Sequence, residues 1–149
     1  MNYETLDVDR TGHVATLTLN RPDKLNAFNQ QMTREFHEAL DELDAEFPEI
    51  RVLILTGAGR GVCSGADVGM QAEGLAGSQG NRSDQRDAEG GFSNSILALG
   101  PHLPRLQQPV IAAVNGVAAG AGLSLALASD IRVASHEARF SSIFIKRSL

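Results

Sequence analysis

The sequence predicts an α/β protein in which parallel strands alternate with helices. Residues 51–56 (RVLILT) and 110–114 (VIAAV) are short apolar runs with the length and β-branching of buried strands. Residues 29–47 instead repeat apolar side chains at every third or fourth position, which is typical of an amphipathic surface helix. Strands that alternate with helices favour parallel pairing through right-handed crossovers. The 149 residues suit a single domain, spanning 1–149, that can bury a sizeable core.

The N-terminal region is predicted to be a β-hairpin. Residues 3–8 and 13–20 have strand composition, and the turn residues 9–12 join them. In VATLTL, residues 14–19, every second side chain is Ala or Leu, so we expect one face of the hairpin to be buried. Pro22 ends the second strand, because proline cannot donate to a sheet.

The middle of the chain alternates between ordered and polar segments. Pro48 ends the amphipathic helix, and a glycine-rich loop follows the strand at 51–56. Residues 71–91 carry almost no large apolar side chains, so we expect a mobile excursion over the surface. Residues 92–106 return to a helical pattern, which Gly100-Pro101 and Pro104 are expected to interrupt.

Residues 109–130 are the most informative stretch. The strand at 110–114 is broken by Asn115-Gly116, a glycine-rich turn occupies 120–122, and residues 123–128 form a compact run that predicts a buried helix. A glycine-rich turn that leads into a helix exposes backbone N–H groups at the positive end of the helix dipole, and therefore favours an electron-rich ligand. Residues 131–134 and 138–145 predict two further extended segments.

Composition narrows the classes of function. The chain has 13 Lys and Arg against 18 Asp and Glu, a net charge of −5, which argues against general binding to nucleic acid or to a membrane surface. No apolar run approaches the roughly 20 residues that span a bilayer, and the N-terminus does not resemble a secretory signal. The single cysteine, Cys63, excludes an internal disulfide and fits the reducing cytoplasm, where we expect the protein. The final IFIKRSL has no capping signal, so we expect the natural polypeptide to continue.

Two local motifs are weak matches to known sites. GAGRG at 57–61 follows a strand, but the dinucleotide-binding spacing G-x-G-x-x-G requires glycine at Val62, so a flexible turn is favoured. GLSLA at 122–126 approximates a nucleophile elbow around Ser124. The preceding predicted strand ends well before Ser124, and only His136 follows it among the histidines. A serine hydrolase is therefore the weaker hypothesis, and a small helix-packing serine is favoured.

Two turns of small residues suggest a shared site. Residues 64–67 (SGAD) and 120–122 (GAG) each follow a predicted strand. If these strands are neighbours in a parallel sheet, both turns lie at the same edge, where α/β proteins bind ligands. Two converging N–H groups form an oxyanion hole, which stabilises negative charge developing on a carbonyl oxygen. From spacing alone, two unrelated turns are the favoured interpretation.

Three longer segments together resemble the crotonase superfamily, the enoyl-CoA hydratase/isomerase family. They are NRPDKLNAF (20–28), LTGAGRGVCSGADV (55–68) and PVIAAVNGVAAGAGLSLALASDIRVAS (109–135), in the order and approximate spacing of the family, with ARFSS (138–142) continuing the match. The resemblance implies a crotonase-like (ClpP/crotonase) spiral of ββα units with parallel sheets. It corresponds to the N-terminal portion of the family, whose C-terminal helices have no counterpart in this sequence.

The resemblance also implies an acyl-CoA thioester substrate and an enolate held in an oxyanion hole. The N–H groups of Ala66 and Ala121 occupy the positions of the two donors. Arg21 and Lys24 occupy positions along the coenzyme A moiety, where their charges would offset its phosphates. The complete set of substrate-binding positions implied by the resemblance is Arg21, Lys24, Ala27, Ser64, Asp67, Val68, Val117 and Gly120. No metal site and no cofactor beyond the coenzyme A of the substrate are implied, and the family usually assembles as homotrimers or dimers of trimers.

The sequence departs from the family at the acid–base positions. Ser124 stands at one glutamate position of the hydratases and Phe144 at the other. Hydration uses two carboxylates, whereas isomerisation needs one base, so isomerisation tolerates these changes better. Asp67 is a candidate base, although an Asp in such a turn more often bonds its own backbone. Hydration or isomerisation is the leading hypothesis. Hydrolysis or decarboxylation on the same fold and a non-catalytic CoA-binding subunit are the alternatives.

Overall fold

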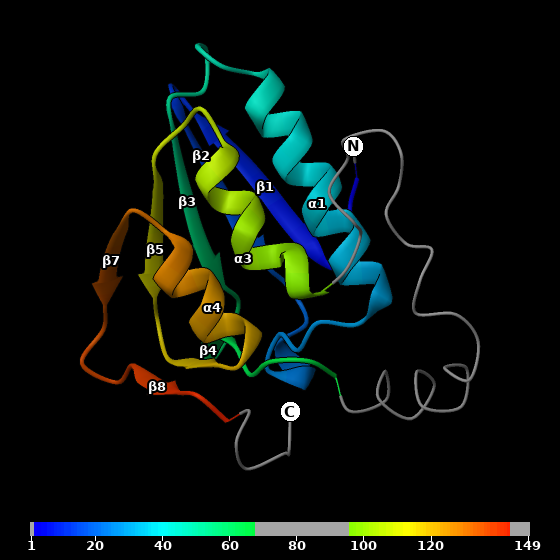
Figure 1. The fold of residues 1–149 in the computed structure, drawn as a ribbon, viewed down its shortest axis with the longest axis vertical. Helices are drawn as coiled ribbons and strands as arrows, with labels where there is room; N and C mark the ends of the chain where they lie inside the picture. Colours follow the sequence, from blue (N-terminus) through cyan, green and yellow to red (C-terminus); the bar gives the residue numbers. More distant parts are fainter. Residues whose placement is uncertain (1, 68–95, 144–149) are drawn as a thin grey trace.

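The computed structural model describes residues 2–67 and 96–143, which form two sheets and a layer of helices (Figure 1). The large sheet has the strand order β1-β2-β3-β5-β7, with bounds Leu6–Thr11, Val14–Leu19, Val52–Gly57, Val110–Val114 and Ile131–Ala134. β1 and β2 are antiparallel, and every other pair in this sheet is parallel. The predicted α/β class is therefore confirmed. The excursion expected at 71–91 lies outside the described residues.

The hairpin confirms the predicted burial pattern and corrects the predicted turn. Ala15, Leu17 and Leu19 are fully buried, and the residues between them are half-exposed. The first strand was predicted at 3–8, but β1 begins at Leu6 and continues to Thr11, which pairs with Val14. The turn is consequently shorter than residues 9–12. Gly12 has φ +59°, the left-handed conformation that tight hairpin turns require.

The predicted amphipathic helix is α1, Gln30–Ala45. Asn29 caps it, because its side-chain oxygen accepts a hydrogen bond of 2.8 Å from the Met32 N–H. In the parallel part of the fold, helix α3 (Leu99–His102) lies between two 3₁₀ turns, η2 (Ile96–Ala98) and η3 (Leu103–Arg105). The prediction that Gly100-Pro101 interrupts this helix is wrong. Pro101 lies in the first turn of α3, where a missing N–H removes no intrahelical bond.

The helix predicted at 123–128 is longer and less enclosed than expected. α4 spans Ala121–Ala128, so it begins directly at the glycine-rich turn. Leu125 and Ala126 are buried, but Leu127 is 65% exposed. A run of small and aliphatic residues does not show which side of a helix faces the core, and this explains the incorrect prediction of full burial.

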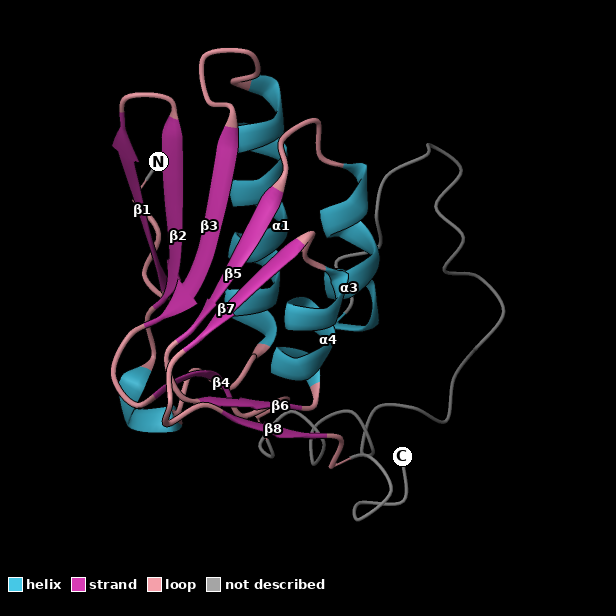
Figure 2. Ribbon diagram, turned by 90° about the vertical axis from the view of Figure 1, so that its left-hand side faces the viewer, coloured by secondary structure: helices cyan, strands magenta, loops and turns pink. Residues whose placement is uncertain are grey.

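A second sheet, not predicted from the sequence, lies across the end of the large one (Figure 2). It has the order β4-β6-β8, with bounds Gly61–Cys63, Val117–Ala119 and Arg139–Ser141. β8 lies within the extended segment predicted at 138–145, whereas β4 and β6 are too short for a hydrophobic period to reveal them. β3, β5 and β7 are each followed by one of these short strands, and the first two units then continue into a helical segment. This is the succession of ββα units that the resemblance implies.

The helices α1, α3 and α4 all cover the same face of the large sheet (Figure 2). The core lies between these layers and consists mainly of aliphatic side chains with two aromatic rings. Its largest fully buried members are Leu17, Leu19, Phe28, Met32, Phe36, Leu40, Leu43, Leu53, Leu55, Leu99, Leu103 and Leu125. No helix in the described ranges is both long and apolar enough to cross a membrane.

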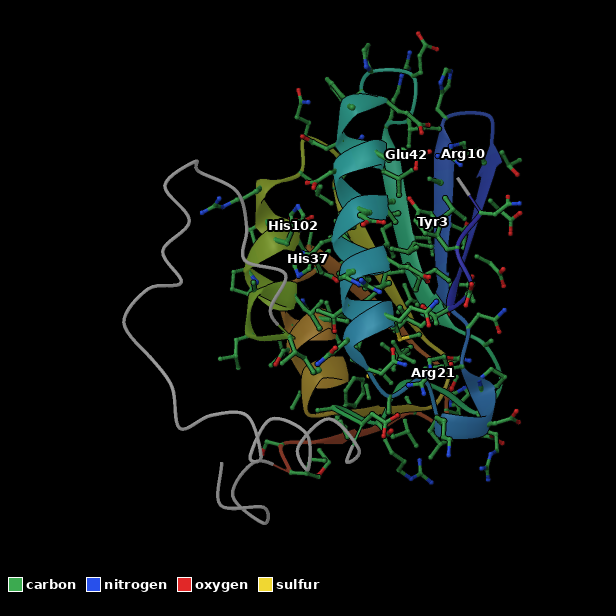
Figure 3. The ribbon with its side chains drawn as sticks, turned by 90° about the vertical axis from the view of Figure 1, so that its right-hand side faces the viewer. Tyr3, Arg10, Arg21, His37, Glu42 and His102 are labelled. Atoms are coloured by element: carbon green, nitrogen blue, oxygen red, sulfur yellow. The ribbon has the colours of Figure 1, made fainter. Side chains whose placement is uncertain are left out.

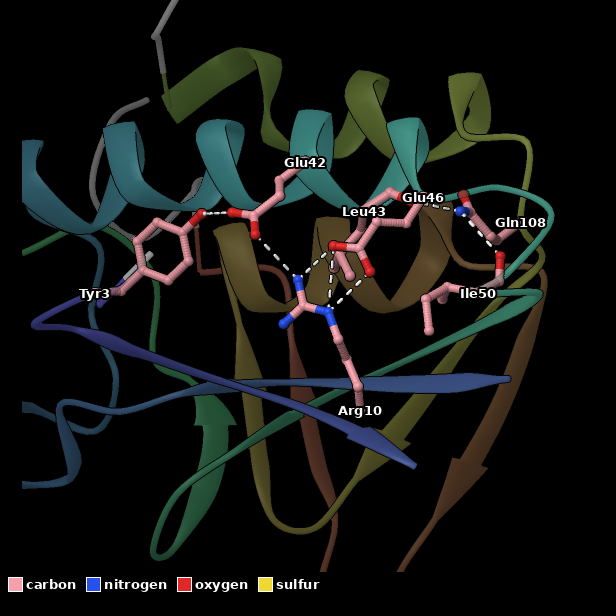
Figure 4. Close-up of polar contacts among 7 residues, drawn as sticks. All are labelled: Tyr3, Arg10, Glu42, Leu43, Glu46, Ile50 and Gln108. Carbon is pink, nitrogen blue, oxygen red and sulfur yellow. Dashed lines mark hydrogen bonds and ion pairs between the residues drawn. The ribbon is translucent and has the colours of Figure 1, made fainter. Parts of the chain in front are cut away.

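Hydrogen bonds and ion pairs connect α1 to the N-terminal segment and to β1, the edge strand of the large sheet (Figure 4). Arg10 on β1 donates from Nε and Nη2 to the Glu46 carboxylate and from Nη2 to Glu42 Oε1, at 2.6–3.2 Å. The Tyr3 hydroxyl donates to Glu42 Oε2 at 2.8 Å. Burial and this carboxylate raise the pKa of Tyr3 well above its ordinary value. At the other end of the same face, Gln108 donates to the carbonyl of Leu43 at 2.6 Å.

A pair of buried histidines lies where α1 packs on α3 (Figure 3). Nδ1 of His37 is 2.8 Å from Nδ1 of His102, and the rings stack with centroids 5.1 Å apart. Nε2 of His102 is 3.1 Å from Oδ1 of Asp41. Because neutral His102 donates from Nε2–H to this carboxylate, its Nδ1 is the acceptor, and His37 donates from Nδ1–H.

The two sheets meet where two backbones cross without side chains between them. A Cβ added to Gly116 would lie 2.1 Å from the Arg60 carbonyl oxygen, and one added to Gly61 would lie 2.4 Å from the Val117 nitrogen. Glycine is therefore required at both positions by close approach. Beyond this crossing the chain leaves the large sheet, and β4 and β6 pair with each other in the small sheet. The crossing therefore determines where the two candidate turns lie.

Candidate functional site

The two predicted turns lie next to each other. The turn at 64–67 follows β4, and the turn at 120–122 joins β6 to α4. β4 and β6 are parallel neighbours, so both turns leave the same edge of the small sheet. Gly65 has φ +114° and Gly120 has φ +53°, and a Cβ on Gly120 would lie only 3.4 Å from the Gly65 Cα. The proximity on which the predicted shared site depends is therefore present in the structure.

The direction of the Ala66 N–H follows from the backbone pairing around it. Phe28 forms a parallel bridge with Ala66: its N–H donates to Gly65 O, and its carbonyl accepts from Asp67 N–H, each at 2.8 Å. In a parallel bridge, the residue between two bonded neighbours directs its own N–H to the opposite side. Ala66 N–H thus points away from Phe28.

Ala121 presents the second N–H. It is the first residue of α4, and the first N–H groups of a helix have no intrahelical acceptor. In the ranges that the structure describes, no hydrogen-bond acceptor is found for Ala66 N–H or Ala121 N–H. Two small residues on adjacent turns consequently offer backbone donors for which residues 2–67 and 96–143 supply no acceptor.

Cys63, which the sequence arguments used only to infer the compartment, packs between the two turns. Its Sγ accepts from Gly65 N–H at 3.2 Å, and a Cβ on Gly122 would lie 2.4 Å from its carbonyl oxygen. Burial raises the pKa of the Cys63 thiol to about 11, so the group is neutral at physiological pH. Cys63 therefore acts as neutral packing beneath both turns.

Arg21 bonds inside the protein, beside the turn that carries Ala66. Its Nη2 forms an ion pair with Asp67 Oδ2 at 3.1 Å, and its Nη1 donates to the Ala27 carbonyl. The two side chains are only 18% and 23% exposed. In Figure 3, Arg21 lies near the end of the molecule that carries the short strands, away from His37 and His102. Asp67, a candidate base in the sequence, is likewise occupied by this ion pair.

Asn26 is a structural residue of the site that the sequence arguments missed. It is fully buried at φ +54°, and its Nδ2 donates to the carbonyls of Ala58 and Gly61, both at 2.9 Å. Its Oδ1 accepts from Arg21 N–H at 2.8 Å. An asparagine shortly after Pro22-Asp23 is a residue type suited to a left-handed turn, and this was the available signal.

The remaining predicted positions surround this centre. Lys24 is exposed on the 3₁₀ turn η1 (Pro22–Lys24), and Ala27 is buried. Ser64 is half-buried, and its N–H donates to the Leu25 carbonyl at 3.0 Å. Val117 is half-buried and Gly120 is buried. Val68 and Phe144 lie outside the described residues.

Ser124 lies within α4, as the sequence arguments expected. Its hydroxyl donates to the Gly120 carbonyl at 3.3 Å. Its Cβ would be 3.8 Å from a Cβ placed on Gly100 of α3. The residue therefore packs in a helix–helix contact and does not stand on a strand-to-helix turn, as an elbow nucleophile does.

Comparison with known proteins gives consistent results. Residues 9–147 match the family model described as enoyl-CoA hydratase/isomerase. The chain is 43% identical over 139 residues to the 1,2-epoxyphenylacetyl-CoA isomerase of Escherichia coli (strain K12), a match that covers 91% of this chain and 49% of that protein. The chain thus spans about half the length of the curated relatives it matches.

Solved structures agree with this result. The crystal structure of an enoyl-CoA hydratase from Bacillus anthracis matches with a TM-score of 0.79 and 33% identity, covering 98% of this chain and 53% of that one. A monofunctional enoyl-CoA isomerase from M. smegmatis matches with a TM-score of 0.68 and 38% identity, covering 91% of this chain and 52% of that one.

Proposed function

Because the chain belongs to the enoyl-CoA hydratase/isomerase family, we propose that it binds an acyl-CoA thioester and stabilises the enolate formed from it. The observation that supports this most strongly is the pair of adjacent turns that carry Ala66 N–H and Ala121 N–H. A thioester carbonyl oxygen between these groups accepts two hydrogen bonds. Both bonds strengthen as negative charge develops on the oxygen.

The geometry of the site supports this polarisation step. The donors are backbone groups held by a strand bridge and by a helix start, so little reorganisation is needed during the reaction. α4 adds the positive end of its dipole at Ala121. Alanine at both positions leaves room for the acyl group, because a larger side chain would fill the place of the carbonyl.

We propose that Lys24 contributes to binding the phosphates of coenzyme A. Its side chain is exposed on η1, next to the segment that supports Ala66. Arg21, the other basic residue expected to have this role, is held by Asp67 and by the Ala27 carbonyl. The buried, neutral Cys63 is compatible with the cytoplasmic location proposed for the reaction.

Double-bond isomerisation of an enoyl-CoA is the reaction that we propose. Ser124 carries no carboxylate, and Asp67 is paired with Arg21, so the described site lacks the two free carboxylates that hydration uses. Isomerisation moves one proton between carbons through the enolate and needs a single base. The similar protein from M. smegmatis is a monofunctional enoyl-CoA isomerase, which is consistent with this choice.

Substitution of Ala121 by proline tests the oxyanion hole. Proline fits the first position of a helix, so Ala121→Pro removes the N–H at small cost to the fold. We expect kcat with 3-enoyl-CoA to fall by about 100-fold or more. Ala121→Gly is the matched control, because it retains the N–H, and we expect it to remain active.

The same assay separates the alternative functions. Conversion of 2-enoyl-CoA to hydroxyacyl-CoA would identify a hydratase, and release of free coenzyme A would identify a hydrolase. Binding of acyl-CoA without turnover of any thioester would instead indicate a non-catalytic CoA-binding subunit. Equal activity of Ala121→Pro and wild type would contradict the proposed donor.

A further inference from the structure

The Arg21–Asp67 ion pair lies directly beside the proposed donor Ala66. We propose that Arg21 is a positioning residue, which holds the Asp67 carboxylate in place and neutralises its charge so that Ala66 N–H can stabilise an enolate. The inference rests on the proposed function. It assigns to Arg21 a role in catalysis in place of the phosphate contact that its sequence position suggested.

Arg21 lies against both backbones that orient the Ala66 N–H. The bridge that directs Ala66 N–H consists of two hydrogen bonds between Phe28 and the turn at 64–67. Arg21 contacts both sides of this bridge, since Ala27 precedes Phe28 and Asp67 follows Ala66. One guanidinium therefore links the segment that contains Phe28 to the turn at 64–67, and the pairing of these two segments orients the Ala66 N–H.

The anchoring matters because the turn itself is flexible in principle. Gly65, immediately before Ala66, has φ +114°, and glycine loses more backbone freedom on ordering than any other residue. Contacts from outside the turn must supply the order. Phe28 gives one such anchor, since it is fully buried and its ring packs edge-to-face on Phe36 with centroids 5.5 Å apart. The Ser64 N–H, which donates to the Leu25 carbonyl, gives another, and Arg21 adds a side-chain anchor at the far end of the turn.

Arg21 also compensates the negative charge of Asp67. Asp67 is adjacent in sequence to Ala66, so an unpaired carboxylate there would repel the negative oxygen that the donor is proposed to stabilise. The ion pair is largely buried, so water screens this repulsion only partly. Arg21 supplies the compensating positive charge. The planar guanidinium reaches Asp67 and the Ala27 carbonyl at once, which the single ammonium of lysine does less well.

The test compares four variants of the full chain: Arg21→Met, Arg21→Lys, Asp67→Asn and the double variant Arg21→Met/Asp67→Asn. We expect Arg21→Met to lower kcat for the thioester that the wild type converts by about 10- to 100-fold, with a smaller change in KM. The double variant, which has no uncompensated carboxylate, should recover at least part of this loss. Arg21→Lys, which keeps the charge, should be less impaired than Arg21→Met.

Arg10→Met is the matched control. It removes the β1 arginine from its ion pair with Glu46, the residue just after α1 and outside the site, so it accounts for a general loss of stability. We expect Arg10→Met to lower the thermal midpoint without lowering kcat at temperatures where the protein is folded.

Two outcomes overturn the inference. One is a kcat for Arg21→Met equal to that of the wild type, and the other is a double variant no more active than Arg21→Met. If the wild type converts no thioester, the proposed function fails by itself. Amide hydrogen exchange at Ala66 then decides the positioning role: faster exchange in Arg21→Met than in Arg10→Met supports it, and equal exchange overturns it.

Discussion

At the scale of single residues, Arg21 and Lys24 have different surroundings although both are cationic and close in sequence. Arg21 is held in an ion pair with Asp67, whereas Lys24 is exposed on η1. Sequence alone gives no way to separate them, because the partner of Arg21 lies 46 positions away. The distinction depends on tertiary structure. It predicts that substitution of Arg21 mainly lowers kcat, whereas substitution of Lys24 mainly raises KM.

Substitution of Lys24 is expected to affect substrate binding. Lys24→Glu places a negative charge where the phosphates of coenzyme A are proposed to lie, so we expect KM for an acyl-CoA to rise by about tenfold with little change in kcat. The same acyl group on pantetheine, which lacks the nucleotide, should show an unchanged KM. Steady-state kinetics with both thioesters measures the difference, and an equal rise for both would contradict the assignment.

Ser124 allows a second prediction at this scale. Its hydroxyl donates to the carbonyl of Gly120, the residue just before α4, and alanine fills almost the same space. We therefore expect Ser124→Ala to keep kcat within about twofold of the wild type. A serine hydrolase predicts loss of all activity instead. Labelling by a fluorophosphonate provides an independent check, and modification of Ser124 would contradict the present assignment.

At the scale of elements, the contact between α1 and α3 contains a titratable group. Burial lowers the pKa of His102 below its ordinary value of 6.5, and the neighbouring His37 contributes, while Asp41 acts in the opposite direction. The unfolded chain therefore takes up a proton at a higher pH than the folded chain does. Proton uptake below about pH 6.5 thus favours the unfolded state.

The expected consequence is a loss of stability in acid. We expect the contribution of His102 to the free energy of unfolding to be present at neutral pH and to be lost as the pH falls below 6.5, with a slope of at most about 1.4 kcal/mol per pH unit. Urea denaturation at neutral pH and at about pH 5.5 measures this change. His102→Gln should reduce the pH dependence, whereas His136→Gln, at an exposed position, should retain it. If His102→Gln left the pH dependence of the free energy of unfolding unchanged, His102 would not be the group responsible for the loss of stability in acid.

The predictability of the elements follows from how each one is stabilised. β3, β5 and α1 were predicted because their own side chains form a β-branched run or an amphipathic period. The strands β4 and β6 were not predicted, because their positions depend on close backbone contacts between distant segments and not on a hydrophobic pattern in their own residues. The site depends on these short strands, so the sequence indicated its two turns but not the bridge and ion pair that hold them.

At the scale of the whole molecule, four large apolar side chains on α4, β7 and β8 are exposed. Leu127 on α4, Ile131 and Val133 on β7, and Phe140 on β8 are 49–65% exposed. β7 is also the last strand of the large sheet, and an unprotected strand of this kind is prone to pair with another chain. We propose that this surface supports the homotrimer or dimer of trimers that the family resemblance implies.

Association of this chain is therefore expected to depend on the exposed surface. Ile131→Lys/Val133→Lys should shift the protein toward the monomer in sedimentation velocity, because the added charges oppose burial of the strand. Phe47→Lys, which replaces an exposed apolar side chain just beyond the end of α1, is the control and should sediment like the wild type. Identical distributions for all three proteins would contradict the proposed surface.

The crossing of backbones at Gly61 and Gly116 has a consequence for how this sequence can vary. Any side chain at Gly116 would have to displace a peptide carbonyl rather than a mobile side chain, whereas a Cβ at Gly12 meets nothing within 4 Å. A saturation library selected for acyl-CoA turnover should therefore return glycine alone at 61 and 116, but asparagine and aspartate as well as glycine at 12. The residue frequencies in the selected library would then identify the two positions of close backbone contact without a structure.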